Sequence, residues 1–296
     1  MYLSGFADEA AKGIDGQIRA TQALGWKHIE SRNVDGTNLT RVSDAKFDEV
    51  FGKLEQAGIT VNCFGSGIAN WACKLTDPPD SSYKELEAAI PRMHRLGTKL
   101  VRIMSFVVPV EDSALGNEAV ATEVIKRVGH LARMAEDGGV TLVHENCNSW
   151  GGRSYEHTLK LLERVDSPAL KLVFDTGNPV FEPDVRGEPP HAMQDALEFY
   201  HKVRDHIAYV HIKDGRLVEG TMVFSFPGEG DGHVREIVAD LHKSGYDGGI
   251  SMEPHLAVVH HDAGVQSDAR VMFDNYVEYG RRFKAILHDI GWSPDP

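Results

Sequence analysis

The sequence predicts an α/β fold of one domain, residues 1–296, built as a (β/α)8 TIM barrel, a parallel eight-stranded barrel with outer helices. Two observations predict it. Short apolar runs alternate with longer amphipathic segments along the chain, and the apolar runs recur about every 35 residues. Strictly alternating strands and helices imply a parallel sheet with helical crossovers, and eight such units favour a closed barrel over an open sheet.

Eight short apolar runs are the expected strands. They are Leu3–Phe6, His28–Ser31, Thr60–Phe64, Leu100–Ser105, Val140–His144, Leu170–Phe174, Ile207–His211 and Gly249–Met252. The amphipathic segments predict helices near residues 13–24, 43–57, 81–96, 117–138, 154–164, 189–203, 232–243 and 266–289. Glycines that favour a left-handed helix end follow several of them, namely Gly25, Gly58, Gly97, Gly138 and Gly139. The longest expected loops, Gly65–Ser82, Asp214–Asp231 and Pro254–Gln266, all follow strands and so share one barrel face.

Composition and charge exclude several classes of function. The net charge of −13 disfavours nucleic acid and anionic membranes as partners. No apolar stretch approaches the ~18 residues that span a bilayer, and the N-terminus lacks the features of a signal peptide. The three cysteines, Cys63, Cys73 and Cys147, have no C-x-x-C spacing and favour a reducing compartment. We therefore expect a cytoplasmic protein.

Four polar residues end four successive expected strands. Glu145 follows Val140–His144, Asp175 follows Leu170–Phe174, His211 ends the seventh run and Glu253 follows the eighth. Strand ends of a closed barrel converge on one ring at its mouth, the usual site of catalysis in this fold. Any one of these residues alone could be a surface charge, but four at the same relative position indicate a shared site.

These four side chains predict a site for one divalent metal ion. Three carboxylates packed together would repel one another and lose solvation, and a cation removes that conflict. Carboxylate oxygens with one imidazole nitrogen suit Mn, Mg or Co, and Zn is possible.

The four strand ends and their neighbours resemble the xylose-isomerase-like barrel superfamily, within it the sugar isomerase/epimerase group that includes D-tagatose 3-epimerase. The motifs are His144-Glu145-Asn146, Phe174-Asp-Thr-Gly-Asn178, Val210-His-Ile-Lys-Asp214 and Ser251-Met-Glu-Pro-His255. The resemblance implies that Glu145, Asp175, His211 and Glu253 bind the metal, and that Glu145 and Glu253 are the acid/base pair. It also implies a homo-oligomer, a dimer or tetramer. Apolar residues of the final helix could supply the contact, or the helix could pack inward on its own barrel; they are Phe273, Tyr276, Phe283 and Ile286.

Further polar residues near the expected mouth are candidates for binding substrate. They are Glu30, His144, Asn178, Lys213, Arg216, Glu229 and His255. Asn178 stands where tagatose-epimerase-like enzymes have a histidine, and Arg216 is only a displaced match to their substrate-binding arginine. Glu30 could instead pair with Arg32, His144 could be a core histidine, and Arg216 a solvated charge. Glu229 is expected on a mobile loop, and Arg102, inside a strand, favours a structural ion pair.

The site predicts an enzyme acting on a small sugar. A metal beside two carboxylates can polarise the carbonyl of a ketose or related keto-polyol, so that a glutamate removes the neighbouring proton and a cis-enediolate forms. Return of a proton gives epimerisation or isomerisation, the leading interpretation. Elimination from a 3-keto sugar or glycoside, with His144 as acid, makes a lyase the alternative. A non-catalytic sugar-binding barrel is disfavoured because all four ligands are present, and an endonuclease for abasic DNA because of the acidic charge.

Overall fold

The computed structural model describes residues 1–257 and 267–294 of this chain. Eight parallel strands form the wall of a barrel in the order β1-β12-β9-β8-β7-β6-β5-β2. Their bounds are β1 (Tyr2–Gly5), β2 (His28–Ser31), β5 (Thr60–Gly65), β6 (Leu100–Ile103), β7 (Thr141–Glu145), β8 (Leu170–Asp175), β9 (Ile207–Ile212) and β12 (Gly249–Met252). β1 and β2 meet through an isolated bridge between Phe6 and Glu30, so the barrel is nearly closed. The predicted TIM barrel is confirmed.

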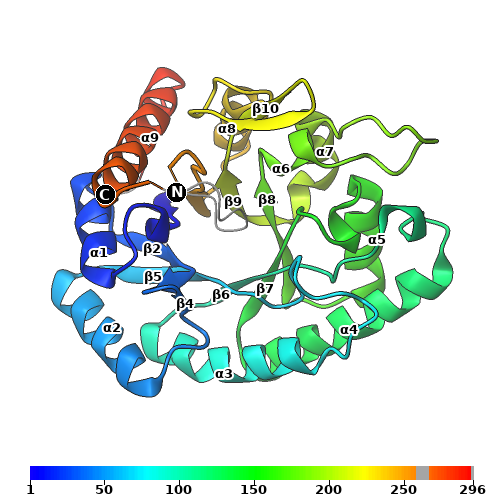
Figure 1. Ribbon diagram of the computed structural model, residues 1–296, viewed down its shortest axis with the longest axis horizontal. Coiled ribbons are helices and arrows are strands. Elements are labelled where there is room, and N and C mark those ends of the chain that lie inside the picture. Colours follow the sequence, from blue (N-terminus) through cyan, green and yellow to red (C-terminus); the bar gives the residue numbers. More distant parts are fainter. Residues whose placement is uncertain (258–266, 295–296) are drawn as a thin grey trace.

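Helices surround this wall on the outside (Figure 1). They are α1 (Ile14–Ala23), α2 (Asp44–Ala57), α3 (Asp80–Leu96), α4 (Glu118–Asp137), α5 (Tyr155–Val165), α6 (Asn178–Phe181), α7 (Ala196–Val203), α8 (Val234–Lys243) and α9 (Ala269–Asp289). Short 3-10 turns are η1 (Ala7–Glu9), η2 (Val110–Asp112), η3 (Trp150–Gly152) and η4 (Arg204–His206). Local chemistry sets their ends: the Ser43 hydroxyl accepts from the Lys46 amide at the start of α2, and Gly58 ends that helix with a φ of 65°.

The apolar faces of the helices pack on the barrel to form the main core. α9 belongs to this core, because Tyr276, Phe283 and Ile286 are each at most 2% exposed. Phe273 also packs against it. The final helix therefore covers its own barrel and does not offer these side chains to a second copy.

Two features differ from the expected elements. The helix expected at 189–203 begins only at Ala196, because Pro189 and Pro190 lack the amide hydrogen that a helix interior needs; the Asp195 carboxylate caps it by accepting from the Glu198 amide at 2.7 Å. The expected helix 266–289 is Ala269–Asp289, and most of the expected loop Pro254–Gln266 lies outside the described residues.

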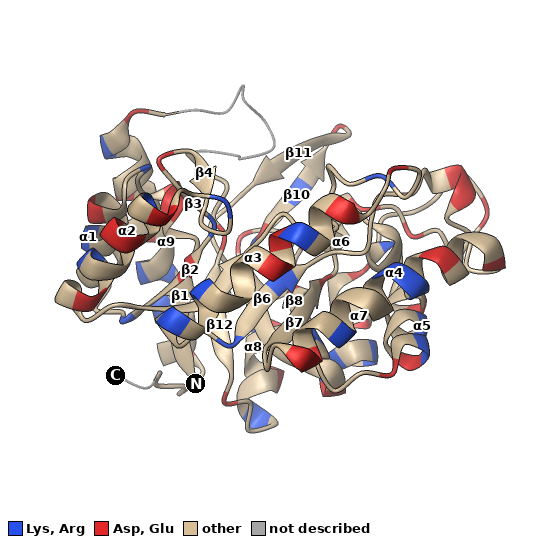
Figure 2. Ribbon diagram, turned by 90° about the horizontal axis from the view of Figure 1, so that it is seen from below, with Lys and Arg blue, Asp and Glu red and all other residues tan. Residues whose placement is uncertain are grey.

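Two hairpins were not predicted, and both rise from the strand-end face. They are β3 (Asn33–Val34) with β4 (Thr37–Asn38), and β10 (Gly215–Val218) with β11 (Thr221–Phe224). Both lie on the side of the barrel opposite the two termini (Figure 2). Their strands, of two to four residues, are too short for apolar patterning to reveal. No helix of the described residues is long and apolar enough to cross a membrane.

Candidate metal centre

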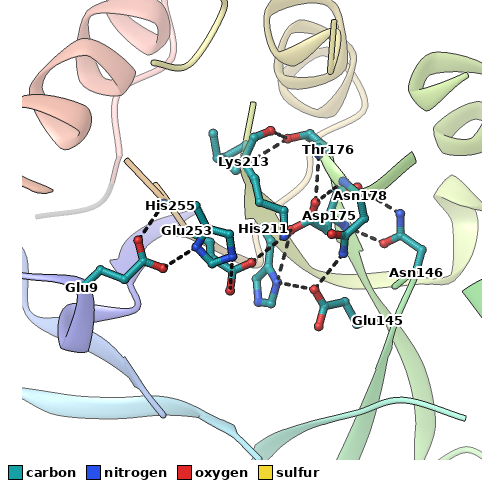
Figure 3. Close-up of polar contacts among 12 residues, drawn as sticks. Glu9, Glu145, Asn146, Asp175, Thr176, Asn178, His211, Lys213, Glu253 and His255 are labelled. Carbon is teal, nitrogen blue, oxygen red and sulfur yellow. Dashed lines mark hydrogen bonds and ion pairs between the residues drawn. The ribbon is translucent and has the colours of Figure 1, made fainter. Parts of the chain in front are cut away.

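The four residues expected at the strand ends converge in the structure. Glu145 and Asp175 are the last residues of β7 and β8, His211 lies in β9, and Glu253 directly follows β12. One ligand atom from each lies within 4.8 Å of the others, and each residue is at most 3% exposed. Figure 3 shows their side chains pointing toward one another. Parallel register causes this, because Asp175 pairs with His211 across β8 and β9.

Asp175 and His211 each direct one unsatisfied atom at this cluster. Asp175 Oδ1 accepts from the amides of Gly177 at 2.8 Å and Asn178 at 2.7 Å. Asp175 Oδ2 and His211 Nδ1 are buried, make no hydrogen bond of good geometry and lie 3.8 Å apart; their nearest charged neighbours are Lys213 Nζ, 3.1 Å from Asp175 Oδ2, and Glu145 Oε1, 3.5 Å from His211 Nδ1. Buried polar atoms are nearly always satisfied, so a carboxylate oxygen and an imidazole nitrogen left facing each other fit a bound cation.

Glu30 lies behind His211 and fixes its ring. Both Glu30 oxygens contact His211 Nε2, at 3.0 and 3.2 Å, and Glu30 is fully buried. A metal-binding histidine commonly donates its second ring N–H to a carboxylate in this way, which leaves the other nitrogen for the metal. Burial lowers the pKa of His211, but the carboxylates of Glu30 and Glu145 outweigh it and raise that pKa to about 10.

Glu145 is held by two side chains from neighbouring strand ends. Arg102 Nη1 donates to Glu145 Oε2 at 2.9 Å, and Asn178 Nδ2 donates to Oε1 at 3.0 Å. Burial raises the pKa of Glu145, but the positive charges of Arg102 and His211 outweigh burial and lower that pKa to about 2. Glu145 is therefore an ionised carboxylate in a buried position.

Glu253 is held in the same manner by different cations. Arg32 Nη1 donates to Glu253 Oε1 at 2.8 Å, and Lys213 Nζ donates to Oε2 at 2.8 Å. Burial raises the pKa of Glu253, but Lys213, His255 and Arg32 together hold it well below its usual range. Each glutamate thus has its own arginine.

Negative charge exceeds positive charge around the cluster. Six buried carboxylates lie here, contributed by segments along the whole chain: Asp8, Glu9, Glu30, Glu145, Asp175 and Glu253. The buried cations that contact them are Arg32, Arg102 and Lys213. Burial raises the pKa of Asp175. Lys213 lowers it in part, but the negative charges of Glu145 and Glu253 raise it again, so the pKa stays above its usual value. A divalent ion among these oxygens would relieve the repulsion.

A cavity of about 750 Å³ opens onto the cluster. The residues that line its inner end include Glu145, Asn178, Lys213, Glu253 and His255. Its outer walls come from the β3–β4 hairpin and from the segment between β5 and α3. A site that combines buried ionised groups with a roomy cavity is suited to a small polar substrate.

The structure places some substrate-binding candidates in the cavity and others elsewhere. Asn178, Lys213 and His255 line it. Glu30 is not a rim residue and does not pair with Arg32, because it lies beneath His211. Arg216 is exposed on β10, outside the cavity lining.

Glu229 also lies away from the cavity. Its carboxylate is exposed and accepts from Arg282 Nη1 on α9 at 2.7 Å. The glycine-rich loop around it is tied down by Asp214, whose carboxylate accepts from the amides of Gly215, Gly228, Gly230 and Gly232 at 2.8 to 3.0 Å. The expectation of a mobile loop that carries Glu229 to the substrate therefore does not fit this arrangement.

His144 faces the helix layer and not the metal cluster. Its Nε2 lies 3.0 Å from Ser105 Oγ, and the ring packs so closely under Gly151 that a Cβ there would come within 2.8 Å of it. Burial lowers the pKa of His144 to about 4. A neutral core histidine is the interpretation that these contacts support.

Sequence reasoning missed the residues that hold the two glutamates. Arg32, Asp8 and Glu9 form a buried ion-pair group, with Arg32 Nε 3.0 Å from Asp8 Oδ2 and Nη2 3.1 Å from Glu9 Oε1. Their partners are distant in sequence, so no local pattern revealed them. Arg102 did carry a signal, a charge inside an apolar strand, and its expected ion pair is to Glu145.

An eight-stranded parallel barrel with a buried acid–histidine cluster at its strand ends defines a TIM-barrel protein with a cluster that could hold a divalent metal. The chain belongs to the xylose isomerase-like TIM barrel family, whose model matches residues 18–274. This confirms the resemblance expected from the motifs.

Comparisons with individual proteins agree on the fold. The chain is 26% identical over 204 residues to an inosose dehydratase of Clostridium beijerinckii, a match that covers 60% of this chain and 64% of that protein. A xylose isomerase-like barrel protein of Mycobacterium smegmatis in complex with magnesium has a TM-score of 0.68 at 18% identity, with 97% of each chain covered. D-psicose 3-epimerase of Clostridium cellulolyticum H10, solved with D-tagatose, has a TM-score of 0.67 at 17% identity, with 97% of this chain and 99% of that chain covered. At these identities the two solved structures show the fold alone.

Proposed function

We propose that this protein is a divalent-metal-dependent isomerase or epimerase of a ketose or related keto-polyol. One observation carries the proposal. Glu145 and Glu253 both line the inner end of the cavity beside the metal cluster, and separate arginines keep each of them ionised. Two buried and independently oriented carboxylates at one reacting centre can perform two proton transfers, one as the base and the other, once protonated, as the acid.

The metal, held by Glu145, Asp175, His211 and Glu253, would supply Lewis acidity to a ketone oxygen of the substrate. Manganese, magnesium or cobalt suits the oxygen-rich donor set better than zinc. We therefore propose manganese, magnesium or cobalt as the bound ion.

The residues of the chain carry out the proton transfers. One glutamate, as its carboxylate, removes the proton from the carbon beside the ketone and becomes a carboxylic acid. The other glutamate first takes a proton from solvent and returns it to the same carbon from the opposite face or to the neighbouring carbon. Release of the first proton to solvent restores both carboxylates. Arg102 and Asn178 orient Glu145 by donating to its two oxygens. Lys213 keeps the pKa of Glu253 low and lines the cavity, where it would donate to a substrate hydroxyl. General acid–base catalysis of this kind contributes about 10²–10⁴-fold.

A second candidate is a lyase that eliminates water from a keto-polyol. The curated relatives support it, because inosose dehydratases match this chain at 24 to 26% identity. The chain spans 64% of the length of the first of these relatives. The first step is the same proton removal, but the leaving hydroxyl needs an acid. Lys213 lines the cavity, whereas His144 faces Ser105, so Lys213 replaces His144 as the candidate acid.

One experiment tests both reactions. Manganese-loaded protein is incubated in heavy water with a panel of ketoses and keto-inositols, and products are followed by NMR and by ultraviolet absorbance. An epimerase gives new stereoisomers with deuterium beside the carbonyl, and a lyase gives an absorbing unsaturated ketone. Glu145→Gln and Glu253→Gln should each abolish turnover, while the exposed Glu111→Gln serves as the control. Full activity in both cavity variants would refute the acid/base assignment.

The oligomeric state and the cytoplasmic location stay predictions. The expected dimer or tetramer loses its structural argument, because the apolar side chains of α9 pack inward. A small-molecule sugar is the partner we propose.

A further inference from the structure

The cavity extends far beyond the residues that carry the proposed chemistry. At about 750 Å³, it lies in the upper part of the ~300–1,000 Å³ range of pockets that hold drug-sized ligands. A single six-carbon sugar at Glu145 and Glu253 would fill only a fraction of it. The remaining volume lies between the β3–β4 hairpin and the segment 66–82.

The outer wall combines an aromatic surface with hydrogen-bonding groups. Trp71 lines the cavity and is 46% exposed, although most large apolar side chains of this chain are buried. Each ring of a sugar has an apolar C–H face and a hydroxylated edge. The face of an indole ring can pack against the apolar C–H face of a sugar, and it offers a large contact area at little cost in side-chain entropy.

Polar groups beside Trp71 suit the hydroxylated edge. Asn70 Oδ1 accepts from the Ala72 amide at 3.0 Å, which orients the side chain. Within residues 1–257 and 267–294, Asn70 Nδ2, Ser81 Oγ and Lys12 Nζ make no hydrogen bond inside the protein, and all three residues line the cavity. These are three donors with no internal partner.

The charges of the outer wall are mostly paired. Asp35 pairs with Lys46 at 2.6 Å, and Glu85 lies 4.0 Å from Arg41. Lys12 alone does not provide the cluster of cations or converging amides that phosphate binding usually requires. The wall therefore favours a neutral, hydroxyl-rich group over a phosphate.

We propose that the outer half of the cavity, lined by Lys12, Asn70, Trp71 and Ser81, is a subsite for a second sugar ring, so that the substrate is a keto sugar carried in a glycosidic linkage. The proposal rests on the proposed function for the identity of the reacting ring. Binding to the subsite itself needs no chemistry and is measured separately.

Binding is measured first, by calorimetry on the manganese-loaded protein, with glucose, cellobiose and glucose 6-phosphate as probes. Cellobiose should bind about tenfold more tightly than glucose, since one well-packed aromatic contact is worth about 1.4 kcal/mol. Trp71→Ala should remove that advantage and Trp71→Phe should keep most of it. The control Met222→Ala, an equally exposed apolar residue on β11, should leave the advantage intact.

Three results overturn the subsite: equal binding of glucose and cellobiose, no measurable binding of cellobiose, or tighter binding of glucose 6-phosphate than of cellobiose. Turnover is measured second. The ratio of kcat/KM for a 3-keto disaccharide to that for a free ketose should fall about tenfold in Trp71→Ala. If no keto sugar is turned over, the proposed function fails while the binding result stands on its own.

Discussion

Replacing Glu30 tests whether the cluster holds a metal, without reference to activity. Glu30 is fully buried, and its oxygens lie 3.0 and 3.2 Å from His211 Nε2. Outer carboxylates that orient a metal-binding histidine typically contribute about 10–100-fold to metal affinity, which is about 1.4–2.7 kcal/mol. In Glu30→Gln a neutral oxygen still accepts the bond, so we expect the lower end, about tenfold weaker binding of Mn²⁺. Glu30→Ala removes the acceptor, and we expect about 100-fold.

The assay is calorimetric titration of metal-stripped protein with Mn²⁺, supported by the visible absorption of a Co²⁺ complex, which reports ligand geometry. Glu85→Gln is the matched control. Glu85 is a half-buried glutamate that accepts from Thr40 Oγ1 and the Gly67 amide, both at 2.8 Å, and it is not one of the four clustered residues or a hydrogen-bond partner of them. Mn²⁺ affinity of Glu30→Ala within about twofold of the parent protein, with the fold intact, would refute the assignment of His211 as a ligand oriented by Glu30.

Two further predictions concern stability. Asp214→Asn should lower the free energy of unfolding by about 2 kcal/mol in urea, because an amide cannot accept all four backbone N–H groups that the carboxylate satisfies; a change under about 0.5 kcal/mol would contradict this. His157 is buried between Ser154 Oγ and the Ser113 carbonyl, each at 2.8 Å, and burial lowers its pKa from 6.5 to about 4. The unfolded chain binds the proton first, so stability is lost as pH falls from 6.5 toward 4, by about 2 kcal/mol between pH 7.5 and pH 5. His157→Gln should lack that part of the pH dependence in urea titrations at both pH values, and an unchanged dependence would refute the cause.

The periodic parts of the fold could be predicted from the sequence, and the long-range polar contacts could not. All eight barrel strands lie within a few residues of their expected positions, because a parallel strand buried on both faces must be a short apolar run. Glu145, Asp175, His211 and Glu253 follow from the same pattern, since a charge at the end of such a run marks the barrel mouth.

The supporting residues carry no such pattern. Glu30 ends a strand as the ligands do, but whether its carboxylate meets sugar, Arg32 or His211 depends on the packing of β9 across the barrel. Arg32 binds Glu253, which is 221 residues away. Apolar periodicity records which face of an element is buried, and it holds no information on which buried polar groups meet.

The Arg32–Glu253 pair has a consequence for how the protein matures on the ribosome. The Arg32 guanidinium donates hydrogen bonds to Asp8 and Glu9, from the first strand–helix unit, and to Glu253, from the last. A contact that closes a loop of this length forms only after the intervening chain has been synthesised and ordered. A nascent chain that has emerged only as far as β9 contains Glu145, Asp175 and His211, and Arg32 already has Asp8 and Glu9 as partners, but the chain lacks Glu253, the fourth proposed ligand. Completion of the last strand is therefore the event that would assemble the proposed metal centre, and metal uptake would report that synthesis of the barrel has reached this strand.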